Sequence, residues 1–131
     1  MKRAVIDTNV LISSILSPEG TPARIMRLIS DQKLQLVLCR EILDEYKRVL
    51  AYNKLRIDPK IQDEAIAKIT GLGIVTESVA GNRPMPDEDD RIFYDTARAA
   101  GAVLITGNLK HYPAEPFIMA PADFLLLHEG G

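Results

Sequence analysis

Short apolar runs alternate along this chain with longer stretches whose apolar residues recur three or four positions apart. A short apolar run is typical of a buried strand, and the longer spacing is typical of an amphipathic helix. Strands that alternate with helices form a parallel sheet covered by helices on both faces. The pattern therefore predicts a three-layer α/β/α fold, doubly wound in the Rossmann manner, with a central parallel sheet of about five strands.

The expected elements can be placed by residue number. Strands are predicted at residues 5–6, 34–39, 73–77, 102–106 and 116–120. Helices are predicted at residues 8–16, 22–29, 42–50 and 89–101, and from residue 59 to Gly71 or Gly73. Thr21 is expected to be the N-cap of the second helix, with Pro22 at the first helical position. The tail after residue 121 is expected to hold only a short apolar turn at 124–127.

Length and composition predict a single domain spanning residues 1–131, because no repeat or long linker divides the 131 residues. The single cysteine, Cys39, excludes an internal disulfide framework and favours a reducing, cytoplasmic location. No signal peptide and no membrane-spanning segment are expected. The net charge of −2 lacks the basic excess of proteins that neutralise phosphates. If the protein acts on nucleic acid, a bound cation must supply part of the attraction.

Polar residues follow or precede the predicted strands at positions that one sheet edge would bring together. Asp7 directly follows the first strand, the acidic run 87–90 precedes the helix before the fourth, and Asn108 follows the fourth. In a doubly wound sheet, the first and fourth strands are expected to be neighbours where the strand order reverses. Ligands bind at that point, outside the carboxyl ends of the strands.

A further acid, Glu45, belongs to the helix after the second strand. It borders the apolar stripe of that helix, which contains Ile42, Tyr46 and Leu50, whereas Asp44 is expected to face water. Glu45 is therefore the acid of this helix that can face the sheet edge.

Each of these residues also has an ordinary structural interpretation. Asp7 alone is typical of a helix N-cap, residues 87–90 of a capping run, Glu45 of a solvated helix position and Asn108 of a turn. Taken together they indicate a cation site, because clustered carboxylates repel one another unless a divalent ion is bound. Oxygen ligands favour Mg²⁺ or Mn²⁺, and no cluster of cysteine and histidine favours zinc.

The chain resembles the PIN-domain family over essentially its whole length. The resemblance lies in "VIDTNVLISSIL", "EILDEYKRVL" and "PDEDDRIFYDTARAAGAVLITGNLKHY", in that order. It implies that Asp7, Glu45 and Asp90 hold the metal and that Asn108 occupies the fourth polar position of the catalytic site. Asp87 would be an outer acid near the site.

The resemblance implies an enzyme, a Mg²⁺- or Mn²⁺-dependent endoribonuclease that hydrolyses RNA phosphodiester bonds and leaves a 5′-phosphate. It also implies the toxin of a type II toxin–antitoxin pair, with RNA as substrate, an antitoxin protein as partner and a homodimer as the assembly. The chain departs from the family at Asn108, where many members have Asp, and at His111, where an acid is frequent. Because the amide of Asn108 adds no charge, a site of three carboxylates is expected to bind one metal well and a second one weakly. Lys110 and His111 are expected to be solvated loop residues or contacts to the RNA backbone.

Three alternatives remain open at this point. A catalytically weak PIN-like module that binds RNA or protein is favoured only by Asn108. A structure-specific DNA nuclease would need additional acids and a helical arch, for which 131 residues leave little room. A small-molecule phosphatase or receiver-type protein would need an acid pair after the first strand or a phospho-acceptor Asp after the third, and neither occurs.

Overall fold

A computed structural model describes residues 1–130 of the chain. Within these residues a parallel sheet has five strands in the order β3-β2-β1-β4-β5. The strands are β1 (Arg3–Ile6), β2 (Gln35–Leu38), β3 (Ile74–Val75), β4 (Val103–Ile105) and β5 (Ile118–Met119). The sheet confirms the predicted parallel, doubly wound topology.

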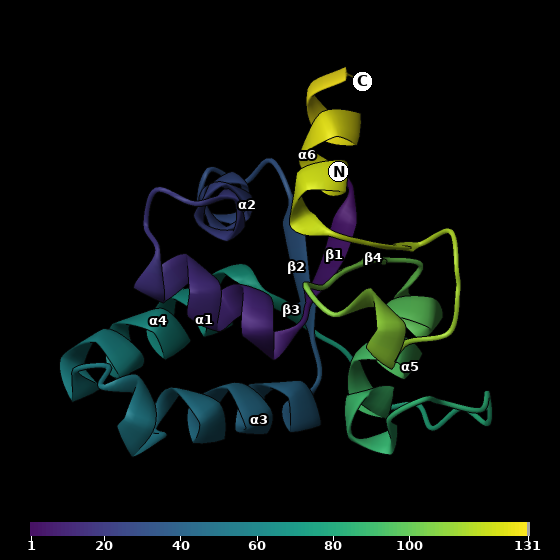
Figure 1. Ribbon diagram of the computed structural model, residues 1–131, viewed down its shortest axis with the longest axis horizontal. Coiled ribbons are helices and arrows are strands. Elements are labelled where there is room, and N and C mark those ends of the chain that lie inside the picture. The colour runs from purple at the N-terminus through teal and green to yellow at the C-terminus, as the bar shows by residue number, and fades with distance from the viewer. Residues whose placement is uncertain (131) are drawn as a thin grey trace.

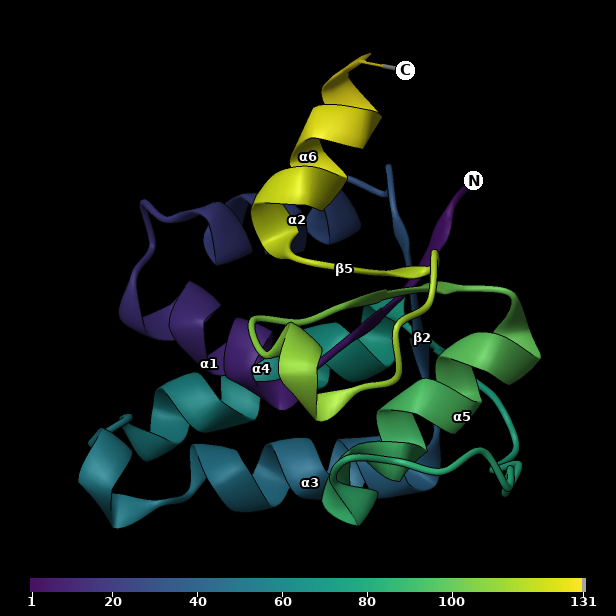
Figure 2. The same cartoon turned by 45° about the vertical axis from the view of Figure 1, so that its right-hand side comes forward.

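Helices cover both faces of the sheet and so form the predicted three-layer α/β/α architecture. The α-helices are α1 (Thr8–Leu16), α2 (Thr21–Ser30), α3 (Arg40–Leu50), α4 (Pro59–Leu72), α5 (Arg91–Ala100) and α6 (Pro121–Gly130). Short 3-10 turns are η1 (Asn53–Leu55), η2 (Glu88–Asp90) and η3 (Leu109–His111). Figures 1 and 2 show α1, α2 and α4 on one side of the sheet and α5 on the other, with α3 running past the carboxyl ends of β1 and β2.

The strand order reverses between β1 and β4, as the sequence predicts. The chain runs outward from β1 to β2 and β3, then crosses back to place β4 beside β1, with Ile6 opposite Ile105. Both strands end at the same sheet edge, so the residues that follow them are neighbours. In α/β sheets this reversal creates the crevice in which ligands bind.

The core lies between α5 and the sheet and between the sheet and the opposite helices. Phe93 on α5 and Tyr46 on α3 are fully buried, with ring centroids 6.4 Å apart. The Tyr46 hydroxyl donates a hydrogen bond to the carbonyl of Ile6, the last residue of β1. This contact ties α3 to the end of the strand that precedes Asp7.

Local signals explain most helix boundaries. Pro59 begins α4 at the predicted residue, and Asp58 caps this helix by accepting a hydrogen bond from the Lys60 backbone N–H (2.8 Å). Gly101 ends α5 in the left-handed conformation, with φ of 63°. At α2 the prediction shifts by one residue, because Gly20 is the N-cap and Thr21 already belongs to the helix.

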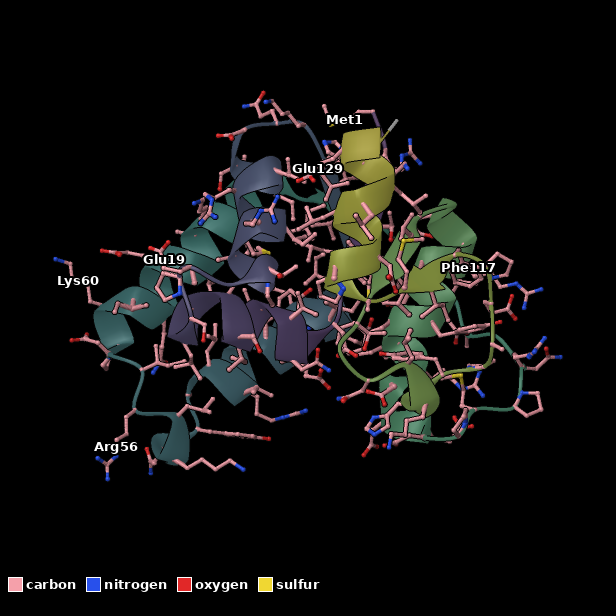
Figure 3. All side chains as sticks on the ribbon, turned by 45° about the horizontal axis from the view of Figure 1, so that its top comes forward. Met1, Glu19, Arg56, Lys60, Phe117 and Glu129 are labelled. Carbon is pink, nitrogen blue, oxygen red and sulfur yellow. The ribbon has the colours of Figure 1, made fainter. Side chains whose placement is uncertain are left out.

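The C-terminal segment differs most from the sequence expectation. Residues 121–130 form the helix α6, whereas the sequence predicts only a short turn at 124–127. Phe124 and Leu125 are buried but Leu126 and Leu127 are exposed, so the apolar run conceals the helical period. Pro121 at the first position and Asp123 in the first turn favour a helix start there. Glu129 of α6, which is labelled in Figure 3, forms an ion pair with Arg24 of α2.

None of the helices within residues 1–130 has the length and apolar character needed to cross a membrane.

Candidate metal centre

Asp7 lies at the carboxyl end of β1 and is only 4% exposed. Its backbone N–H donates to the carbonyl of Ile105 (3.0 Å), which extends the pairing with β4. Its carboxylate Oδ2 accepts hydrogen bonds from the hydroxyls of Thr106 (2.7 Å) and Tyr112 (2.9 Å). Although Asp7 occupies the N-cap position of α1, its side chain makes no capping hydrogen bond. The N-cap interpretation therefore does not explain this buried acid.

The acids around Tyr112 affect the pKa of its hydroxyl. Burial raises the pKa of its hydroxyl, and the charges of Asp7 and Asp90 raise it further. The hydroxyl therefore stays protonated and acts as a hydrogen-bond donor to Asp7.

Glu45 reaches toward Asp7 from α3. The Thr8 hydroxyl donates to Glu45 Oε2, and Arg48 Nη2 lies 3.5 Å from Oε1. Burial raises the pKa of Glu45, and the charge of Asp7 adds to this increase, while Thr8 and Arg48 act in the opposite direction. Asp44 is exposed, as the helical spacing predicts. Glu45 is thus the acid of α3 that faces the end of β1.

Asp90 is the last residue of η2 and the N-cap of α5, but its side chain makes no capping hydrogen bond. Its Oδ2 is 3.1 Å from Nδ1 of His111. Burial, followed by the charges of Asp7 and Asp87, raises the pKa of Asp90 to about 6. Asp87 itself caps η2 by accepting from the Asp89 backbone N–H (3.0 Å), so the capping interpretation holds for that member of the acidic run.

The ligand atoms of Asp87, Asp90 and His111 all lie within 4.8 Å of one another. In the described part of the chain, this is the one group of three potential metal ligands so compact. Asp7 and Glu45 lie outside the group, although Asp7 raises the pKa of both Glu45 and Asp90. The acids predicted from the sequence therefore share one sheet edge, but Asp7, Glu45 and Asp90 do not by themselves form a group this compact.

Asn108 follows β4 at the same edge and is exposed. Its backbone N–H donates to the Thr106 hydroxyl (3.0 Å), the same hydroxyl that binds Asp7. Its side chain does not cap η3. Asn108 is therefore tied to the site through its backbone, and its amide side chain lies at the surface.

Sequence reasoning assigns no role at the acids to several residues that contact them here, among them Tyr112 and His111. Tyr112 binds Asp7 because η3 folds the chain back over the end of β1, and no spacing in the sequence reveals such a turn. His111 is expected from the sequence in the loop or on the RNA backbone, whereas its Nδ1 faces Asp90. The one signal in the sequence for His111 is its place three residues after Asn108.

The donor set fits a divalent cation. Four carboxylates, those of Asp7, Glu45, Asp87 and Asp90, lie at or beside one edge, and oxygen ligands are those that Mg²⁺ and Mn²⁺ prefer. The raised pKa values of Glu45 and Asp90 reflect the electrostatic cost of holding these groups charged. A bound cation would remove that cost.

A separate apolar groove lies between α1, α2 and α4, with a volume of about 250 Å³. Its lining includes Leu11, Met26 and Ile69, together with the cationic Arg27 and Lys68, and it contains no carboxylate. This groove therefore offers no acidic ligand for a cation, in contrast to the β1–β4 edge.

The raised pKa of Asp90 predicts how stability depends on pH in a chelator. An Asp whose pKa is about 6 in the folded state and 3.8 otherwise binds more protons in the folded state between these values. The free energy of unfolding should therefore fall as pH rises from about 4 to about 6, and Glu45 acts with the same sign. Other acids also make the free energy of unfolding depend on pH. The measurement is therefore the difference in free energy of unfolding between wild type and Asp90→Asn, obtained from urea unfolding at several pH values in this range. As pH rises, Asp90→Asn should become more stable relative to wild type. A difference that does not change with pH would contradict the raised pKa of Asp90.

Comparison with known proteins places the chain beside others of this architecture. A family model described as the PIN domain matches residues 3–110. The uncharacterized protein MJ1680 of Methanocaldococcus jannaschii is 31% identical over 109 residues, which cover 81% of this chain and 70% of that protein. The crystal structure of PAE2754 from Pyrobaculum aerophilum superposes with a TM-score of 0.66 at 14% identity, covering 99% of this chain and 91% of that one. The last similarity concerns the fold alone.

Proposed function

Because the chain belongs to the PIN-domain family, whose members are generally nucleases, we propose that it is a divalent-metal-dependent endoribonuclease that hydrolyses RNA phosphodiester bonds. The observation that carries the proposal is the gathering of Asp7, Glu45 and Asp90 beside the carboxyl ends of β1 and β4. Asp7 and Asp90 cap no helix with their side chains, so the ordinary role of an acid at a helix start does not account for them.

Asp7, Glu45 and Asp90 would hold Mg²⁺ or Mn²⁺ in this proposal. Such an ion, when bound, would supply a ligand position for a phosphate oxygen and would lower the pKa of an attacking water. It would also supply part of the attraction for RNA, which a net charge of −2 does not provide.

The remaining residues position these acids. Thr106 and Tyr112 fix Asp7 through Oδ2, and Thr8 fixes Glu45. Asn108 is exposed after β4 at the same sheet edge, where its amide N–H₂ can donate to water or to a phosphate oxygen. No covalent nucleophile is required.

We extend the proposal to the biological role that the family resemblance implies. The protein would be the toxin of a type II toxin–antitoxin pair, acting as a homodimer in the cytoplasm and silenced by an antitoxin protein. The buried free thiol of Cys39 is compatible with a reducing compartment. Residues 1–131 would form one nuclease domain.

A second candidate function is a PIN-like module that binds RNA or protein but cleaves weakly. The observation that favours it is Asn108, which adds no charge where an acid would strengthen metal binding. The two functions differ in one property, which is metal-dependent turnover of RNA.

The proposal is tested by comparing two neighbouring acids of α3. Glu45→Gln should weaken Mn²⁺ binding by at least about tenfold and reduce RNA cleavage, because a ligand carboxylate is lost. Asp44→Asn removes the same charge from an exposed position one residue away and should leave both unchanged. Isothermal titration with Mn²⁺ and cleavage of a mixed single-stranded RNA measure the two effects. Equal behaviour of the two variants would remove Glu45 from the metal site.

A further inference from the structure

His111 is the histidine that lies among the acids of the β1–β4 edge. The chain contains two histidines, and the other, His128, stacks on Phe124 in α6. We propose that His111 supplies a nitrogen ligand, through Nδ1, to a divalent cation that Asp87 and Asp90 also bind, and that this ligand gives the centre a preference for Mn²⁺ over Mg²⁺. The proposal rests on the metal centre of the proposed function, with which this ion would share Asp90 as a ligand, but it does not require that RNA be the substrate.

The spacing of the three side chains is that of a single coordination shell. His111 Nδ1 and Asp90 Oδ2 are 3.1 Å apart, and the ligand atom of Asp87 lies within 4.8 Å of both. With metal–ligand distances of about 2.1 Å, adjacent ligand atoms are about 3.0 Å apart and opposite ones about 4.2 Å. One ion therefore fits among these atoms with small adjustments of the side chains.

The backbone holds these ligands in place. The His111 N–H donates to the Asn108 carbonyl (3.0 Å), and the following residue, Tyr112, is buried and bonded to Asp7. Asp87 is fixed by its hydrogen bond from the Asp89 N–H. Ligands held in advance lose little conformational entropy on binding an ion, which strengthens the site.

Nitrogen in the ligand set changes which ion the site prefers. Mg²⁺ binds oxygen ligands and retains water, whereas imidazole is a good ligand for transition metals. A shell of two carboxylates and one imidazole therefore favours Mn²⁺ over Mg²⁺. A shell of carboxylates alone would bind Mn²⁺ and Mg²⁺ with more similar affinities.

The alternative role for His111 is a hydrogen bond that orients Asp90 without touching the ion. The ring is 45% exposed, so either role is sterically open. The two roles differ in one observable, which is direct contact between nitrogen and the metal.

Electron spin echo modulation of bound Mn²⁺ detects that contact in the wild-type chain, prepared without a histidine tag. We expect modulation from a histidine nitrogen, which changes its pattern when histidine is labelled with ¹⁵N. The control variant His128→Gln should retain the signal, since it leaves His111 as the sole histidine. Bound Mn²⁺ without nitrogen modulation in wild type would overturn the proposal, and so would failure of the chain to bind Mn²⁺.

Titration calorimetry gives a second readout. His111→Ala should weaken Mn²⁺ binding by about tenfold or more and Mg²⁺ binding by less than about threefold. Equal losses for both ions would assign His111 to orienting Asp90 and overturn its role as a ligand. If the protein cleaves RNA but bound Mn²⁺ shows no coupling to nitrogen, the nuclease proposal stands and the proposal for His111 is wrong. If bound Mn²⁺ shows coupling to nitrogen but RNA is not cleaved, the proposal for His111 stands and the nuclease proposal is wrong.

Discussion

Replacing Asp7 with asparagine is expected to abolish the stabilisation that a divalent cation held by Asp7, Glu45 and Asp90 gives to the fold. An ion that binds only the folded state contributes RT ln(1 + [L]/Kd), about 2.7 kcal/mol at one hundred times Kd. Asp7 is the most buried acid of the edge, and Thr106 and Tyr112 hold its carboxylate in place. An asparagine side chain at this position has no charge with which to bind the ion. Urea unfolding with and without Mg²⁺ or Mn²⁺ measures the loss.

Without the cation, Asp7→Asn should be no less stable than wild type. The amide oxygen can still accept the two hydroxyl hydrogen bonds, and the variant removes the charge that raises the pKa of both Glu45 and Asp90. Asp44→Asn is the matched control and should keep the full response to the cation. An equal response in wild type and Asp7→Asn would exclude Asp7 as a ligand.

Truncating Phe93 to alanine is expected to cost about 3–5 kcal/mol of stability, because a fully buried aromatic ring leaves a cavity. Phe93 lies in the first turn of α5, the helix that begins directly after Asp90, and its ring packs near Tyr46. The variant should therefore loosen the acidic edge as well as the core. Equilibrium unfolding in urea measures the change in free energy.

Leu126 provides the control for this core prediction. It is 70% exposed on α6, so Leu126→Ala should change stability by no more than about 0.5 kcal/mol. A small effect for Phe93→Ala, close to that of Leu126→Ala, would contradict the packing described between α5 and the sheet.

The sheet and most helices can be predicted because their signals are local. The apolar run before Asp7 forms β1, and α1 spans the predicted residues 8–16. The adjacency of β1 and β4 follows from the handedness and winding of alternating strands and helices rather than from any single residue. Helical spacing alone distinguishes Glu45 correctly from the exposed Asp44.

The details of the metal centre depend on contacts that no local pattern encodes. Tyr112 and His111 reach Asp7 and Asp90 only because the 3-10 turn η3 folds back after β4. The helix α6 escapes prediction because half of its apolar run faces solvent, so its sequence lacks an amphipathic period. Long-range pairing of this kind is set by the whole fold, which local spacing does not describe.

Cleavage of a mixed single-stranded RNA as a function of Mn²⁺ concentration, by wild type and by Asp90→Asn, tests the central claim most directly. The account predicts cleavage by wild type that rises with Mn²⁺ and disappears in a chelator. It also predicts that Asp90→Asn, which lacks a ligand carboxylate at the β1–β4 edge, cleaves far more slowly at every concentration. A wild type no more active than Asp90→Asn would contradict the nuclease assignment and leave a binding module.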